Sequence, residues 1–271
     1  MKRKAMLFIT FLLLIFLIVA CKETSKEEAK TNTANLQTHK EDLVFVNFRD
    51  IRDLNPHLYA GEMYAQGMLY EPLVKVSENG VDPCLAEKWD ISEDGRVYTF
   101  YIRKNVYFSD GLICDAHAIK ANFDAIIENR NRHTWLEMMN LLKSVEVIDD
   151  YTFRITMNEP YYPMLIELGG IRPFGIISPA SMKEGSTLNG VKSYVGTGAY
   201  ILTDFVTDEY AIFEVNQKYW GKQPAIKKIT VKVISDNQTR IFALQKNEID
   251  LIYGKNMLGV APVFVAFSPK Y

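Results

Sequence analysis

Cysteine is scarce in this sequence, with three among 271 residues. So few thiols exclude a small scaffold held together by disulfide bonds. A basic excess is also absent, because 31 lysines and arginines stand against 33 acidic residues, and we therefore expect no nucleic-acid partner. With 48% hydrophobic and 24% charged residues, the composition indicates a globular protein that is long enough to bury a core.

Motifs of common catalytic sites are absent as well. Neither His-Glu-x-x-His nor Gly-x-Ser-x-Gly occurs in the sequence. Gly185 and Gly190 have the spacing of a phosphate-binding loop, but Val191 stands where that loop needs a lysine. No set of nucleophile and base is visible either. The sequence therefore predicts a protein that is not an enzyme and that needs no cofactor.

Histidines and cysteines form no pattern typical of a metal site. The four histidines lie far apart, at positions 39, 57, 117 and 133. We expect each of them to be a surface or capping residue rather than a metal ligand. Cys84 and Cys114 could pair in an oxidising compartment, or they could remain two unpaired, partly buried thiols, and the sequence leaves both alternatives open.

The N-terminus carries a long uncharged run. Three basic residues at positions 2–4 precede the apolar stretch 5–20, which ends Ile-Val-Ala directly before Cys21. This order is typical of a secretory signal, and the stretch is shorter than the about 20 residues that span a bilayer. Its ending resembles a bacterial lipobox. We therefore predict a signal peptide over 1–20 and lipidation of Cys21, with an uncleaved membrane anchor as the alternative.

Residues 21–42 are predicted to be a flexible tether. This segment contains no aromatic residue and a single leucine, so it cannot bury a core. Attached to a lipidated Cys21, it would hold the folded body close to a membrane outside the cytoplasm.

Short strands and helices alternate irregularly over residues 43–254. The pattern predicts strands at 43–46, 97–102, 144–148, 151–157, 211–215 and 229–234, and helices at 64–70, 116–129, 135–142 and 238–246. Asp115 is placed to cap the most periodic of these helices. This mixture indicates a mixed α/β or α+β fold rather than a regular βαβ array.

Arginine stands beside aromatic and methionine residues in three segments. These are NRNRHTW at 129–135, GIRPF at 170–174, and LNPHLY at 54–59 followed by Met63. The planar fork of arginine matches a carboxylate with two hydrogen bonds, and rings and a thioether can form an apolar wall. Together they suggest a small carboxylate-bearing ligand, although each alone is also compatible with a surface arginine or a core tryptophan.

From about residue 47 to 254 the chain resembles the solute-binding proteins of ABC importers, family 5. The segments that carry the resemblance are LNPHLY (54–59), MLYEPLVK (68–75), LAEKWDISEDG (85–95), FSDG (108–111), NRNRHTWLE (129–137), YYPML (161–165), RPF (172–174), VGTGAY (195–200), NQKYWGKQPAIKKITVKVI (216–234) and EIDLIYG (248–254). LNPHLY, the Arg-His-x-Trp segment and Arg-Pro-Phe are similar to the nickel-importing type.

The resemblance implies a type II periplasmic-binding-protein fold of the peptide and nickel binders. Members of that family have two lobes with the ligand between them and are roughly twice as long as this chain. The resemblance therefore implies that 43–254 is essentially the first lobe alone, and that 255–271 is a divergent tail where the second lobe would begin.

The same resemblance implies a ligand and a site. Arg132 and Arg172 would bind the carboxylates of a Ni(II) chelate, formed with histidine or a small carboxylate metallophore, while Tyr59, Met63 and Trp135 would line the pocket wall. No metal ligand is expected in this chain, because the family's direct histidine ligand lies in the missing half. We expect an extracytoplasmic monomer that delivers the chelate to a membrane permease. The alternatives are an oligopeptide- or dipeptide-binding protein and a non-binding truncated fragment.

Overall fold

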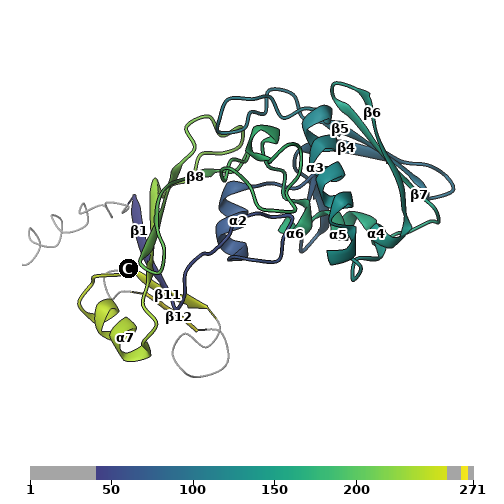
Figure 1. Cartoon of the computed structure of the whole chain (residues 1–271). Coiled ribbons are helices and arrows are strands. Elements are labelled where there is room, and N and C mark those ends of the chain that lie inside the picture. Colours follow the sequence, from purple (N-terminus) through teal and green to yellow (C-terminus); the bar gives the residue numbers. More distant parts are fainter. Residues whose placement is uncertain (1–40, 255–263, 268–271) are drawn as a thin grey trace, which may run out of the picture. The chain divides into compact units, whose positions relative to one another are not determined.

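The structure, a computed structural model, describes residues 41–254 and 264–267. Within these ranges the strands form a six-stranded sheet, a four-stranded sheet and a two-stranded hairpin (Figure 1). No helix of the described residues combines the length and the hydrophobicity that crossing a bilayer requires. The predicted signal peptide, Cys21, the tether up to residue 40 and most of the tail beyond 254 lie outside the described residues.

The six-stranded sheet is mixed, and its first strand along the chain lies inside it. Its order is β12-β11-β1-β10-β9-β8, in which β1 runs parallel to both of its neighbours and the other pairs are antiparallel. The strands are β1 (Asp42–Asn47), β8 (Tyr200–Val206), β9 (Tyr210–Val215), β10 (Lys228–Val233), β11 (Leu251–Gly254) and β12 (Phe264–Phe267).

Helix α7 (Asn237–Gln245) packs beside this sheet (Figure 1). The carboxylate of Asp236 caps its N-terminus by accepting a hydrogen bond from the backbone N–H of Thr239 at 2.8 Å. Between the helix and the sheet, one buried apolar cluster contains Val46, Ala243 and Ile252. The predicted helix at 238–246 is thereby confirmed, with its apolar side against β1 and β11.

The four-stranded sheet is antiparallel, with the order β4-β5-β7-β6. Buried and half-exposed residues alternate along both inner strands, as expected for a sheet that has one face against a core. The strands are β4 (Ala86–Ile91), β5 (Val97–Ile102), β6 (Leu142–Asp149) and β7 (Thr152–Met157).

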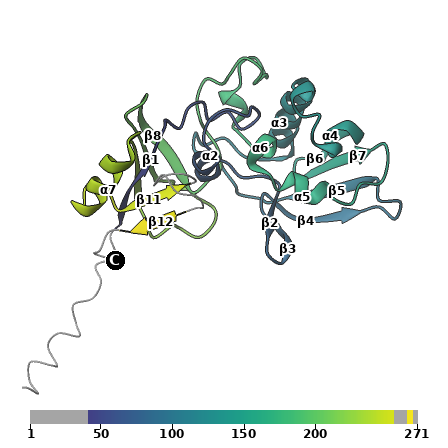
Figure 2. The same cartoon turned by 90° about the horizontal axis from the view of Figure 1, so that it is seen from below.

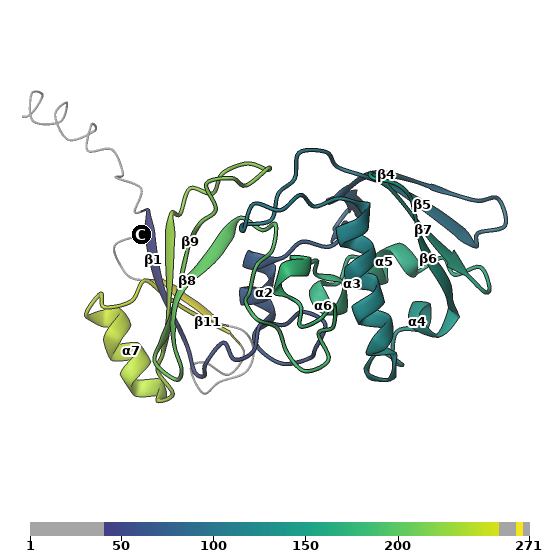
Figure 3. The ribbon, with the colours of Figure 1, turned by 45° about the horizontal axis from the view of Figure 1, so that its top comes forward.

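Helix α3 (Ala116–Glu128) covers the buried face of this sheet (Figure 3). Asp115 caps the helix as predicted, since its side chain accepts a hydrogen bond from the backbone N–H of Ala118 at 2.9 Å. The ring of Phe123 lies 5.1 Å from that of Phe153 in β7 and 6.0 Å from that of Phe174. The apolar stripe read from the sequence therefore forms the centre of the largest core.

Short elements connect these parts. The β2–β3 hairpin packs near α5, and α2 contacts both β8 and α6 (Figure 2). They are α2 (Met63–Leu69), β2 (Val74–Ser77), β3 (Gly80–Pro83), the 3₁₀ turn η1 (Arg130–Arg132), α4 (Glu137–Leu141), α5 (Met164–Leu168), α6 (Ile171–Phe174) and the 3₁₀ turn η2 (Pro179–Ser181).

The structure differs from the predicted elements at several places, and two of these differences have a clear physical cause. The helix expected over 135–142 is shorter, because Leu142 adopts extended backbone angles and begins β6. Strand β8 was not predicted. Its side chains are only partly buried and a register shift interrupts its pairing with β9 between Leu202 and Asp204, so the period-two pattern of a strand is weak there.

Candidate functional site

The segment 54–59 is fixed by buried amide side chains. Nδ2 of Asn55 donates to the carbonyl oxygen of Thr187 at 3.0 Å, and its Oδ1 accepts from the backbone N–H of His57 at 3.1 Å. His57 is fully buried, whereas Tyr59 keeps 39% of its surface exposed. The His57 ring thus lies in the interior, whereas the Tyr59 ring is accessible to solvent.

Tyr59, His133 and Trp135 form a connected group. The hydroxyl oxygen of Tyr59 lies 2.7 Å from Nδ1 of His133 and accepts a hydrogen bond from Nε1 of Trp135 at 2.8 Å. Both neighbouring rings meet the Tyr59 ring edge to face, with centroids at 5.5 and 5.8 Å. His133 is fully buried while Trp135 is 64% exposed, so the group runs from the interior to an exposed aromatic surface.

Arg172 lies in α6, held by acceptors from α2 and the loop before it. Its Nε donates to Oε1 of Gln66 at 2.5 Å, and Nη2 donates to the carbonyl oxygen of Gly61 at 2.6 Å. Gln66 is itself fixed, because its Nε2 donates to the carbonyl oxygen of Asn55. Nη1 of Arg172 has no hydrogen-bond partner among the described residues, which leaves that edge of the guanidinium for another acceptor.

The Arg172 guanidinium also influences Tyr59 electrostatically. The pKa of Tyr59 is raised mainly by burial, and the hydrogen bond from Trp135 and the charge of Arg172 oppose the rise. Partial burial lowers the pKa of Arg172 itself, yet arginine stays protonated at any physiological pH. A fixed positive charge therefore acts on the hydroxyl of Tyr59.

Arg132 and Met63 are less closely tied to this group. Arg132 ends the turn η1, is exposed, and acts on its neighbour His133 through charge. Met63 begins α2 with 57% of its surface exposed, and no hydrogen bond or ring contact of the described residues joins it to the aromatic group. Tyr59, Trp135 and Arg172 are thus brought together, whereas the position of Met63 in a common site stays a prediction.

Two histidines differ from the sequence-based expectation. We expected surface or capping residues, but His57 and His133 are both fully buried. Burial lowers the pKa of His57 to about 3, and burial together with the charge of Arg132 lowers that of His133 to about 4. Both rings are therefore neutral near pH 7. In the sequence, these two histidines are distinguished only by their positions inside the LNPHLY and Arg-His-x-Trp segments.

No metal centre of three or more His, Cys, Asp or Glu side chains exists among residues 41–254 and 264–267. Cys84 and Cys114 are free thiols in the same buried core, which decides between the two alternatives left open by the sequence. Burial raises the pKa of Cys84 to about 12 and also raises that of Cys114. Neither thiol is therefore a reactive thiolate near pH 7.

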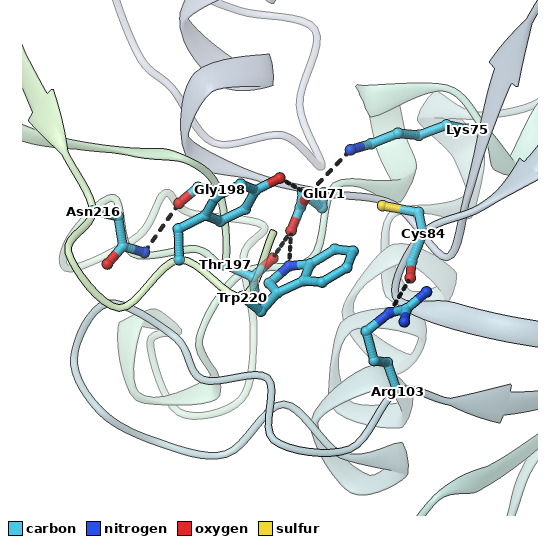
Figure 4. A network of polar contacts seen from close by, with 9 residues as sticks. Glu71, Lys75, Cys84, Arg103, Thr197, Gly198, Asn216 and Trp220 are labelled. Carbon is cyan, nitrogen blue, oxygen red and sulfur yellow. Dashed lines mark hydrogen bonds and ion pairs between the residues drawn. The ribbon is translucent and has the colours of Figure 1, made fainter. Parts of the chain in front are cut away.

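A second polar network surrounds the buried carboxylate of Glu71 (Figure 4). Its Oε1 accepts from the Tyr219 hydroxyl at 2.9 Å and from Lys75 Nζ at 3.1 Å. Its Oε2 accepts from Trp220 Nε1 at 2.6 Å and from the Thr197 hydroxyl at 3.0 Å. These donors come from the EPLVK, Gly-Thr-Gly and Asn-x-x-Tyr-Trp-Gly segments, so one carboxylate connects three of the motifs read from the sequence.

The Gly-Thr-Gly segment passes unusually close to the end of α2. A Cβ atom added at Gly196 would lie 2.1 Å from the carbonyl oxygen of Leu69, and one at Gly198 would lie 2.4 Å from that of Met68. The backbone N–H of Gly198 donates to Leu69 O at 2.9 Å. Glycine is therefore required here for close approach of two backbones.

This architecture matches that of known proteins. A family model described as bacterial extracellular solute-binding proteins, family 5 middle, matches residues 80–266. The chain is 45% identical over 226 residues to the nickel-binding periplasmic protein of Escherichia coli K12, covering 82% of this chain and 43% of that protein. The chain thus spans less than half the length of this curated relative.

Solved structures agree with this likeness. NikA from Brucella suis in complex with Fe(III)-EDTA superposes with a TM-score of 0.78 at 47% identity, over 79% of this chain and 44% of that one. NikZ from Campylobacter jejuni in complex with Ni(L-His) gives a TM-score of 0.70 at 25% identity, over 79% and 43%. The expected mixed α/β fold of the type II binding proteins is thereby confirmed.

Proposed function

The chain belongs to family 5 of the bacterial extracellular solute-binding proteins, and from this premise we propose that it captures a nickel chelate. The ligand would be Ni(II) bound by histidine or by a small carboxylate metallophore, delivered to the membrane permease of an ABC importer. The observation that carries the proposal is the group of Tyr59, Trp135 and Arg172, in a chain that is 45% identical to a nickel-binding periplasmic protein.

The chemistry of this group suits a chelator better than a bare metal ion. Arginine has no lone pair for a metal, so Arg172 and the exposed Arg132 would bind carboxylates of the chelator. Nη1 of Arg172 has no partner among the described residues, and its other nitrogens are already oriented by Gln66 and Gly61. The rings of Tyr59 and Trp135 would cover the apolar part of the ligand, and we propose that Met63 contributes to the same wall.

The remaining expectations belong to the same proposal. We propose an extracytoplasmic protein that is anchored to a membrane by lipid on Cys21 and acts as a monomer. Its relatives include periplasmic binding proteins, which supports a location outside the cytoplasm. None of these roles needs a nucleophile, a general base or a cofactor.

The described residues form an open surface rather than an enclosed pocket around the proposed site, since Trp135, Met63 and Tyr59 are 64%, 57% and 39% exposed. Exposed ion pairs contribute roughly 0–1 kcal/mol each. We therefore expect this surface, taken by itself, to bind the chelate weakly.

The test is a titration of the full chain, labelled with ¹⁵N and held in detergent, with nickel chloride plus L-histidine. Paramagnetic broadening should affect the indole N–H resonance of Trp135 first, whereas the half-buried Trp89 and Trp220 serve as internal controls. Nickel alone, histidine alone and alanyl-alanine form the control arms. An equal response of all three indoles to nickel and histidine would contradict the proposed site, and a response of Trp135 to the dipeptide alone would favour the peptide-binding alternative.

A further inference from the structure

His133 is the buried neighbour of an exposed tyrosine and does not itself reach the proposed ligand. It is fully buried, and its Nδ1 lies 2.7 Å from the Tyr59 hydroxyl. Its Nε2 has no hydrogen-bond partner among the described residues. A polar ring that is buried at such a cost invites a functional explanation, because an unsatisfied buried polar group is unfavourable.

Counting hydrogen-bond partners favours one direction for the bond between Tyr59 and His133. Nε2 of His133 has no partner in either tautomer, so the hydroxyl hydrogen of Tyr59 makes the difference. Indole Nε1 of Trp135 can only donate, so the Tyr59 oxygen is the acceptor of that bond. Burial beside Arg132 keeps His133 neutral near pH 7, and a neutral imidazole has one donor and one acceptor nitrogen. If Nδ1 were the donor, the Tyr59 oxygen would accept twice and its own hydrogen would have no protein partner. If Nδ1 is the acceptor, the hydroxyl hydrogen has a partner.

We propose that His133 is a positioning residue that takes the hydroxyl proton of Tyr59 as a hydrogen bond and thereby fixes which group Tyr59 offers to the ligand. Tyr59 then presents its remaining lone pair outward and acts as an acceptor. The ligand atom that faces Tyr59 must be a donor, such as the N–H of an amine or a hydroxyl group. This inference rests on the proposed function, because it assumes that Tyr59 lines the ligand site.

The arrangement adds a second kind of recognition to that of the arginines. Arg172 and Arg132 offer donors only and select carboxylates, whereas an outward lone pair on Tyr59 selects an N–H or O–H group. Together they favour a chelator that carries both a carboxylate and a donor, as an α-amino acid does, over one that carries carboxylates alone. Trp135 contributes its ring rather than its N–H, which Tyr59 already accepts.

The tautomer of His133 can be measured without any substitution. Long-range ¹H–¹⁵N spectra of the full chain, with ¹⁵N in its histidines and no ligand added, identify which ring nitrogen carries the proton. We expect a protonated Nε2 and a bare Nδ1 for His133. A protonated Nδ1 would overturn the inference, whether or not the chain binds nickel.

Two variants test positioning. His133→Asn can keep an acceptor near the place of Nδ1, and His133→Leu removes it. The Trp135 indole N–H resonance should move in His133→Leu and return toward its original position in His133→Asn, while that of Trp220, which donates to Glu71, stays in place. An unmoved Trp135 resonance in a folded His133→Leu protein would overturn the positioning role, and if that variant does not fold, the tautomer measurement decides alone.

A ligand titration separates this inference from the proposed function. With nickel and L-histidine, His133→Leu should bind roughly 2- to 10-fold more weakly than the unmodified chain, the effect of one neutral hydrogen bond. Nickel with EDTA, a chelator of carboxylates and tertiary amines that carries no N–H or O–H group, should lose less. Equal losses for both chelates would overturn the donor preference, whereas absence of binding to the unmodified chain would overturn the proposed function and leave the tautomer result standing.

Discussion

The indole nitrogen of Trp220 donates a 2.6 Å hydrogen bond to the carboxylate of Glu71, although 149 positions separate the two residues along the chain. The same carboxylate accepts from Tyr219, Thr197 and Lys75. Its charge is thus distributed over four donors at a position that is only 3% exposed. This carboxylate joins the beginning of the described chain to segments near residues 197 and 220.

Glu71→Gln should lower the free energy of unfolding by about 2–4 kcal/mol. Each carboxylate oxygen accepts two bonds, so either orientation of the new amide turns its NH₂ group toward the Lys75 ammonium or the Trp220 N–H, neither of which can accept. Urea denaturation followed by circular dichroism measures the loss. Glu87→Gln, at an exposed position of β4, is the matched control, and equal stability of both variants would contradict the role given to Glu71.

Arg172→Ala should weaken the response to nickel plus L-histidine by up to about 5-fold, because one ion pair on an open surface contributes up to about 1 kcal/mol. Arg96→Ala removes an exposed arginine at a turn far from the aromatic group in sequence and should leave the titration midpoint unchanged. Because Arg172 also contacts Gln66 and Gly61, thermal denaturation must accompany the titration. A folded Arg172→Ala chain with an unaltered midpoint would refute the assignment.

Two glycine substitutions should act in opposite directions. Gly198→Ala places a methyl group against the backbone of Met68 and Leu69, and we expect about 1–3 kcal/mol of destabilisation. Gly67 lies in α2 with no atom within 4 Å of an added Cβ, so Gly67→Ala should stabilise by about 0.5–1 kcal/mol. Urea denaturation curves of both variants measure these changes. An unchanged free energy of unfolding in Gly198→Ala would show that the Gly198 segment can move away from Met68 and Leu69 without cost.

Mild acid should destabilise the protein through its two buried histidines. Their folded pKa values, about 3 for His57 and about 4 for His133, lie below the value of about 6.5 expected for an unfolded chain. Between these limits the unfolded state binds more protons, so stability is full above pH 6.5 and falls as the pH drops toward 4.

The expected slope approaches 1.4 kcal/mol per pH unit for each histidine. Urea midpoints measured from pH 7.5 to pH 5 test this, with a His57→Asn chain expected to show a shallower slope. A flat profile in the unmodified chain would mean that both rings reach solvent.

Cys21→Ser should abolish membrane attachment. The expectation rests on the basic residues 2–4, the apolar stretch 5–20 and the Ile-Val-Ala-Cys ending. Detergent phase partitioning and the intact mass of the chain, expressed in a bacterium, would show the loss of lipid or an uncleaved precursor. Unchanged mass and partitioning would exclude lipidation at this position.

An element can be predicted from the sequence where one physical cause dominates its formation. The helix at 116–128 carries a regular apolar stripe and an aspartate cap, and both are present in the structure. Strand β8 could not be predicted, because its partly exposed residues and its shifted register weaken the alternation of buried and exposed side chains. The burial of His57 and His133 could not be predicted, because the LNPHLY and Arg-His-x-Trp segments single out the two histidines without indicating whether their rings are buried or solvated. Their burial depends on Thr187 and Tyr59, partners that are distant in the chain.

The position of β1 between β10 and β11 has a consequence for the order in which the chain folds. Strands β4 to β7 come from one continuous stretch of residues 86–157 and can pair early through local hairpins. Strand β1 must instead wait for partners near residues 228 and 251, and such distant pairing is slow. Pulsed hydrogen exchange should therefore protect the amides of β5 and β7 before those of β1, so that during synthesis the first strand stays unpaired until almost all of the described chain has emerged.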